Sequence, residues 1–79
     1  MYYVIMKDNF MSGWGRAEGA TNLYEVECDT LDQADMIERN AEDRSDMSNI
    51  KVKRNETREY NGVVISRVHF DDLGGIWKK

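Results

Sequence analysis

The feature that most constrains the fold is a single helix signal with strand-like sequence on both sides of it. Thr30 and Gln33 form a capping box, in which the Thr30 hydroxyl accepts a hydrogen bond from the Gln33 backbone N–H and the Gln33 side chain reaches back. The acidic residues around Thr30 suit the positive end of the helix dipole, and Arg44 suits its negative end. An apolar stripe repeats at helical spacing: Leu31, Ala34, Ile37 and Ala41. The pattern predicts a helix over residues 30–44, and its small alanines indicate close packing onto a sheet.

Four other segments have strand-like sequence: residues 2–7, 23–28, 47–54 and 63–70. The first is apolar on both faces, which predicts an interior strand. In the second, Tyr24, Val26 and Cys28 alternate with Glu25 and Glu27, so the two glutamates are expected to point to solvent. The predicted fold class is α+β with element order β-β-α-β-β: a four-stranded, mainly antiparallel sheet with one amphipathic helix packed on one face. The 79 residues are expected to form a single domain, 1–79.

Two interpretations of the link between the last two strands stay open. Asn61-Gly62 is a strong signal for a tight hairpin turn, which would pair Tyr60 with Val63. A turn at residues 55–57, with Gly62 as a bulge, is the alternative. Beyond the last strand, residues 71–77 are predicted to form one capped turn whose Trp77 packs back on the sheet.

Charge, cysteine content and hydropathy restrict the setting and the partners. The net charge is −4, with ten acidic and two basic residues from 18 to 46. Such a block would repel a phosphate backbone, so direct nucleic-acid binding is not expected. A single cysteine permits no internal disulfide and fits a reducing compartment. Residues 1–7 lack the features of a secretory signal, and no apolar run approaches the roughly 20 residues that span a bilayer, so a cytoplasmic protein without membrane contact is predicted.

The sequence carries no catalytic or metal-binding signature, so a non-enzyme without cofactor or metal is predicted. His69, the single histidine, lies in a predicted strand and is interpreted as a packed or surface residue. Cys28 on the inward face of a strand is expected to be a small buried hydrophobe. Glu25 and Glu27 share one face of their strand and could flank a cation or a glycosidic bond, although solvent exposure is the ordinary explanation.

One long connection has an unusual composition. Glycines permit positive φ angles and let the backbone approach a ligand, a tryptophan between them offers a stacking face, and an arginine offers donors for phosphate or carboxylate. The helix exit that follows could complete such a site, or its charged residues could simply pair locally. The candidate ligand- or partner-binding residues are Phe10, Ser12, Gly13, Trp14, Gly15, Arg16, Arg44 and Asp46. The competing interpretation is a structural loop whose Trp14 plugs the open face of the sheet.

Several stretches resemble a group of short phage and mobile-element accessory proteins. They are DNFMSGWG at residues 8–15, AEG at 17–19, ECDT at 27–30, QA at 33–34, NA at 40–41, RSDM at 44–47, DLG at 72–74 and IW at 76–77. The resemblance implies an accessory protein in a host bacterial cytoplasm. It also implies that the glycine-tryptophan loop and the helix exit are recurring features, and a counter-defence role is one analogy that a phage origin suggests.

The favoured hypothesis is a non-enzymatic, phage-type accessory protein. It would bind a host protein or a small anionic or nucleotide ligand through the loop of residues 10–16, and would self-associate as a homo-oligomer because the domain is small. The alternative is an acidic, nucleic-acid-mimicking, anti-CRISPR-like inhibitor of a host nucleic-acid-handling complex. That inhibitor would use the helix face formed by Asp32, Asp35, Glu42 and Asp43. A small hydrolase or transferase is a third hypothesis.

Overall fold

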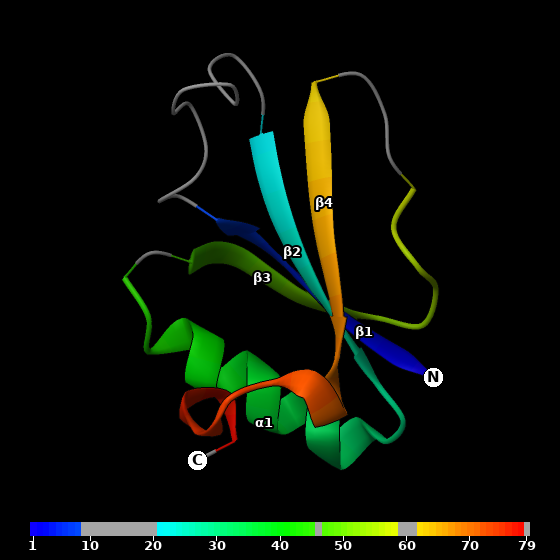
Figure 1. Ribbon diagram of the computed structural model, residues 1–79, viewed down its shortest axis with the longest axis vertical. Coiled ribbons are helices and arrows are strands. Elements are labelled where there is room, and N and C mark those ends of the chain that lie inside the picture. The colour runs from blue at the N-terminus through cyan, green and yellow to red at the C-terminus, as the bar shows by residue number, and fades with distance from the viewer. Residues whose placement is uncertain (9–20, 46, 59–61, 79) are drawn as a thin grey trace.

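A four-stranded sheet with one α-helix packed on one face forms the architecture, as the sequence predicted (Figure 1). The computed structural model describes residues 1–8, 21–45, 47–58 and 62–78. The strands are β1 (Tyr2–Asp8), β2 (Thr21–Cys28), β3 (Met47–Lys53) and β4 (Val63–His69). Helix α1 (Leu31–Glu42) lies between β2 and β3 in the chain, and two short 3₁₀ helices, η2 (Phe70–Asp72) and η3 (Gly75–Trp77), follow β4.

The strand order is β3-β1-β2-β4, which places β1 and β2 in the interior of the sheet. β1 pairs antiparallel with both β2 and β3, and Val4 of β1 lies opposite Val26 on one side and Val52 on the other. The prediction of an interior first strand is therefore confirmed. β4 pairs parallel with β2, so the sheet is mixed but mainly antiparallel.

The predicted hairpin between the last two strands is wrong. β3 and β4 occupy opposite edges of the sheet, so the chain between them crosses from one edge to the other. Gly62 does adopt a positive φ of 82°, and its carbonyl accepts a 2.7 Å hydrogen bond from the Thr21 backbone N–H at the start of β2. The Asn61-Gly62 pair thus correctly indicated a positive φ at Gly62. It could not reveal that β4 would pair with β2.

Helix α1 begins as the capping box predicted. The Gln33 backbone N–H donates to the Thr30 hydroxyl at 3.2 Å, and the Gln33 side chain accepts from the Asp29 backbone N–H at 2.8 Å. The helix ends at Glu42 rather than at the predicted residue 44, because Asp43 is its C-cap. In the described ranges 1–8, 21–45, 47–58 and 62–78, no helix is long and apolar enough to cross a membrane.

The hydrophobic core lies between α1 and one face of the sheet. Three of the four predicted stripe residues are buried in it, whereas the first, Leu31, is exposed because it stands at the helix start. Trp77 packs back against the sheet as predicted, with its ring stacked on Tyr24 at 5.7 Å between centroids. The Asn40 side-chain amide donates to the Trp77 carbonyl at 2.8 Å, which fastens the C-terminal segment to α1. The buried core cluster consists of Val4, Met6, Val26, Cys28, Ala34, Ile37, Ala41 and Trp77.

Candidate functional site

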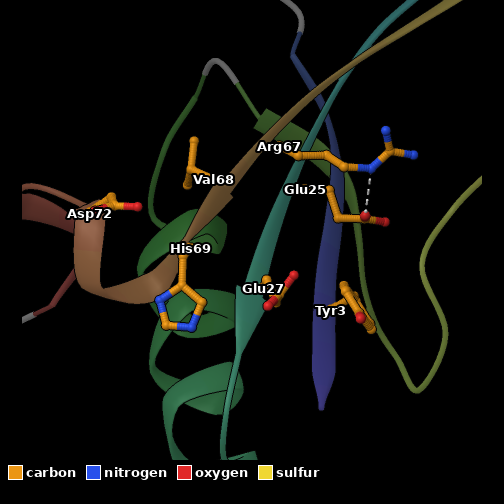
Figure 2. Close-up of a pocket in the computed structure, with 7 residues that line it drawn as sticks. All are labelled: Tyr3, Glu25, Glu27, Arg67, Val68, His69 and Asp72. Atoms are coloured by element: carbon orange, nitrogen blue, oxygen red, sulfur yellow. Dashed lines mark hydrogen bonds and ion pairs between the residues drawn. The ribbon is translucent and has the colours of Figure 1, made fainter.

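A pocket of about 230 Å³ lies at the surface of the sheet where β1, β2 and β4 run side by side. Strand register sets out its residues: Glu27 of β2 stands opposite Tyr3 of β1 and beside His69 of β4, and Glu25 stands beside Arg67. Because side chains alternate along a strand, these residues project from the face that α1 leaves uncovered (Figure 2). The pocket is lined by Tyr3, Glu25, Glu27, Arg67, Val68, His69 and Asp72.

Glu25 contradicts the expectation that both strand glutamates point to solvent, because only 1% of it is exposed. One carboxylate oxygen lies 3.2 Å from Arg67 Nε, and the other accepts a 3.0 Å hydrogen bond from the Thr57 backbone N–H. A buried carboxylate is tolerated when it is paired and hydrogen-bonded, and both oxygens of Glu25 are. The alternating pattern identified the correct face but could not reveal that another part of the chain covers it.

The covering segment is the chain that leaves β3. Arg67 also pairs with Glu56, at 2.9 Å from Nε to Oε1, and its Nη2 donates to the Thr57 carbonyl. The Lys53 ammonium donates to the Thr57 hydroxyl at 2.8 Å. Arg67 and Glu25 therefore hold residues 56 and 57 against the sheet beside the pocket.

Glu27 differs from Glu25 although the two residues share a face. Its side chain is only partly buried, and within the described part of the chain no hydrogen bond or ion pair engages its carboxylate (Figure 2). The pKa of the Tyr3 phenol opposite is raised, first by burial and then by the charges of Glu27, Glu56 and Glu25. The carboxylates of Glu27, Glu56 and Glu25 therefore act on the Tyr3 phenol at this end of the pocket.

His69 closes the pocket on the β4 side and is fully engaged. Its Nε2 lies 3.3 Å from Asp29 Oδ1, and its Nδ1 accepts a 3.1 Å hydrogen bond from the Asp71 backbone N–H. The hydrogen bond to Asp29 is the main cause that raises the His69 pKa; burial acts against it, and the charges of Asp29, Asp71 and Glu27 add to it. The sequence had indicated only a packed or surface histidine.

The side chains of Asp29, His69 and Asp71 bring their donor atoms within 4.8 Å of one another, which is a spacing that a metal ion could use. However, the lone pair on Nδ1 already accepts the Asp71 N–H, which places the proton of the neutral ring on Nε2, facing Asp29. A metal ligand would need a free lone pair on one ring nitrogen. The geometry therefore fits a histidine–carboxylate clamp better than a metal site.

Of the site residues predicted from sequence, the structure describes only Arg44. Its guanidinium carbon lies 4.8 Å from the centre of the Trp77 ring, on the core side of the molecule rather than at the pocket. The other seven predicted residues lie outside the described residues: Phe10, Ser12, Gly13, Trp14, Gly15, Arg16 and Asp46. The sequence did not indicate Tyr3, Thr57 or Arg67, because strand register brings Tyr3 and Arg67 beside β2 and hydrogen bonds bring Thr57 to Glu25 and Arg67.

Two further sequence expectations concern individual side chains. Cys28 is buried, as predicted, and burial raises the pKa of its thiol to about 11. The four acidic residues proposed as a helix face, Asp32, Asp35, Glu42 and Asp43, are all exposed. That acidic helix face is therefore accessible, on the opposite side of the sheet from the pocket.

Comparison with protein-family models, with curated proteins and with solved structures returns no match. The site is therefore interpreted from its own geometry.

Proposed function

We propose that this protein is a non-catalytic accessory protein that binds a basic partner protein through the face of its sheet opposite α1. The observation that carries the proposal is the pocket beside Glu27, whose carboxylate no described residue engages. A half-buried carboxylate without a partner has lost part of its hydration, and a cation from a binding partner would restore that loss. The net charge of −4 favours encounter with a basic partner over long range.

The state of the reactive side chains supports a binding role over catalysis. Both ring nitrogens of His69 are engaged, so neither is free to take a proton from a substrate. The pKa values of the Tyr3 phenol and the Cys28 thiol are both raised, which disfavours the anionic forms that act as nucleophiles or bases. None of these three side chains is an activated nucleophile or base of the kind that a hydrolase or transferase uses, which supports the binding role.

The proposal is tested by capture of partner proteins from bacterial lysate with matched charge-reversal variants. Glu27→Lys reverses the pocket carboxylate, and the double variant Asp35→Lys/Glu42→Lys reverses the exposed acidic helix face. We expect Glu27→Lys to lose a basic partner that both the wild-type protein and the helix variant retain. Retention of every partner by a folded Glu27→Lys protein would overturn the proposal.

The acidic helix face is the second candidate, and the exposure of its four carboxylates favours it. A row of exposed acidic groups can mimic a nucleic acid and occupy the basic groove of a nucleic-acid-handling complex. Loss of the partner in Asp35→Lys/Glu42→Lys, with retention in Glu27→Lys, would transfer the proposal to this face.

The loop of residues 10–16 remains a third proposal that rests on its sequence. Trp14→Ala and Arg16→Ala, compared in a thermal-shift panel of nucleotides and other small anions, test it directly. A ligand that shifts the melting temperature of the wild-type protein but of neither variant would support binding by the loop. The resemblance to phage accessory proteins supports a counter-defence role in a bacterial cytoplasm.

A further inference from the structure

We propose that the pocket receives one arginine side chain of the partner, held between the Glu27 carboxylate and the Tyr3 ring. This inference rests on the proposed function and names the chemical group that the pocket recognises. Four properties of the pocket carry it: its charge balance, its size, the pairing of Glu27 with Tyr3, and the hydrogen bonds that hold the wall beside Glu27.

The charge balance around the pocket is negative, and its cations are already engaged. Arg67 pairs with Glu25 and Glu56, His69 contacts Asp29 and Asp71, and Lys53 donates to Thr57. Glu27 and Asp72 also line the pocket. Among the described residues that line the pocket or contact its lining residues directly or through Thr57, six carboxylates stand against three basic side chains: Glu25, Glu27, Asp29, Glu56, Asp71 and Asp72 against Lys53, Arg67 and His69. An entering cation would reduce this excess of negative charge.

The size of the pocket favours a single side chain over a larger ligand. Pockets for drug-sized molecules usually measure about 300–1,000 Å³. The volume of about 230 Å³ is smaller than that range. A nucleotide is larger than this space and would bring phosphate charge toward Glu27.

Glu27 and Tyr3, which are cross-strand neighbours in the pocket lining, favour a guanidinium over an ammonium. A carboxylate can accept two parallel hydrogen bonds from the planar guanidinium fork, which a lysine cannot supply. Tyr3 stands directly opposite Glu27 in the strand register, so its ring can stack on the same plane. Glu27 is free to accept both bonds because no described residue occupies its oxygens.

The wall beside Glu27 is already in place before any ligand arrives. Glu25 is held by Arg67 and by the Thr57 backbone N–H, so Arg67 does not compete for Glu27. Preorganisation of this kind lowers the entropic cost of binding, because fewer side chains must be ordered when the ligand arrives.

The test is a two-dimensional amide NMR titration with N-acetyl-arginine amide and, as matched neutral probe, N-acetyl-citrulline amide. We expect the arginine probe to shift the amides of Tyr3, Glu27 and His69, and the citrulline probe to bind about tenfold more weakly. Glu27→Gln should weaken the binding of the arginine probe by a similar factor. Glu38→Gln, which changes a helix carboxylate that belongs to neither proposed binding face, should leave the affinity for the arginine probe unchanged.

Equal binding of the two probes, or shifts confined to helix α1, would overturn the inference. So would an unchanged affinity in Glu27→Gln. These results are independent of the lysate experiment. If Glu27→Lys loses a basic partner but the arginine probe does not bind at Glu27, the proposed function stands and the arginine assignment fails. If Glu27→Lys retains every partner, the proposed function fails whatever the probe does.

Discussion

Both faces of the sheet bury side chains, but the interactions that stabilise the two faces differ. On the face under α1, the side chains of Val4, Met6 and Val26 have no exposed surface and pack against Ala34 and other apolar residues of the helix. On the other face, a carboxylate is buried by an arginine and a backbone N–H. The first face is stabilised by the removal of apolar surface from water. The second face also buries two apolar side chains, Ile5 and Ile65, but it depends in addition on complete pairing of the buried Glu25 carboxylate.

The two glutamates of strand β2 differ in burial and in bonding. Its Glu25 and Glu27 point to the same face, yet Glu25 is almost fully buried and doubly engaged while Glu27 is partly exposed and unengaged in the described part of the chain. One glutamate therefore supports the fold, and the other is available to a partner.

The largest effect is expected from a cavity under the helix. Ile37 has no exposed surface, and Ile37→Ala should lower the free energy of unfolding by about 2–5 kcal/mol because it removes buried methylenes and leaves a void. Equilibrium urea unfolding measures this change. Val64→Ala is the matched control, since Val64 is 49% exposed and its truncation should change stability by less than about 0.5 kcal/mol. Similar losses in both variants would show that the helix-covered face is not the core.

A smaller loss is expected when the partner of the buried carboxylate is removed. Arg67→Ala leaves Glu25 without its charged partner, which should cost about 1–3 kcal/mol. The Arg67 side chain is 36% exposed, so water compensates for part of the loss. Arg58→Ala, at an exposed arginine in the same covering segment, is the control and should be nearly neutral. Equal stability of the two variants would mean that the Arg67–Glu25 pair does not support the fold.

The capping box should contribute about as much as one hydrogen bond. Thr30→Ala removes the oxygen that accepts the Gln33 N–H and should destabilise the protein by about 1 kcal/mol. Thr30→Ser keeps the oxygen and should restore nearly all of the loss. If serine destabilises as much as alanine, the loss comes from the Thr30 methyl group rather than from the cap.

The smallest effect is expected from the His69 clamp. The pKa of the His69 imidazole is raised in the folded protein. The clamp therefore stabilises the fold at a pH below the ordinary histidine pKa of about 6.5. This stabilisation disappears as pH rises through the folded-state pKa. The stability difference between the wild-type protein and His69→Gln should therefore shrink as pH rises through that window. Because His69 is the single histidine, NMR titration of its ring reports the pKa without overlap.

Asp29→Asn is the control for the clamp. It removes the acceptor that is the main cause of the raised pKa and should move the His69 pKa down toward its ordinary value. An imidazole pKa at or below about 6.5 in the wild-type protein would contradict the clamp.

Local patterns made the elements predictable. The capping box at Thr30, the helical stripe and the alternation at Tyr24, Val26 and Cys28 depend on neighbours within a few residues, and all correspond to elements of the structure. The fold class followed because one amphipathic helix can bury its stripe only against a sheet.

Contacts between distant residues made the remainder unpredictable. The parallel pairing of β4 with β2, the burial of Glu25 and the stacking of Arg44 on Trp77 each join residues at least 30 positions apart in the chain. No pattern within a single segment encodes such pairs. The candidate pocket depends on the same register, so the sequence indicated two glutamates on one face but not Tyr3, Arg67 or Thr57 around them.

The most direct test of the division within β2 is a side-by-side urea unfolding of Glu25→Gln and Glu27→Gln. Both variants remove one charge and keep the shape of the side chain. Glu25→Gln should lower the free energy of unfolding by about 1–2 kcal/mol, because it weakens the charge-assisted bonds from Arg67 and Thr57. Glu27→Gln should stay within about 0.5 kcal/mol of the wild-type protein. Equal losses in the two variants, or a larger loss in Glu27→Gln, would contradict the account that the fold uses Glu25 and leaves Glu27 for a partner.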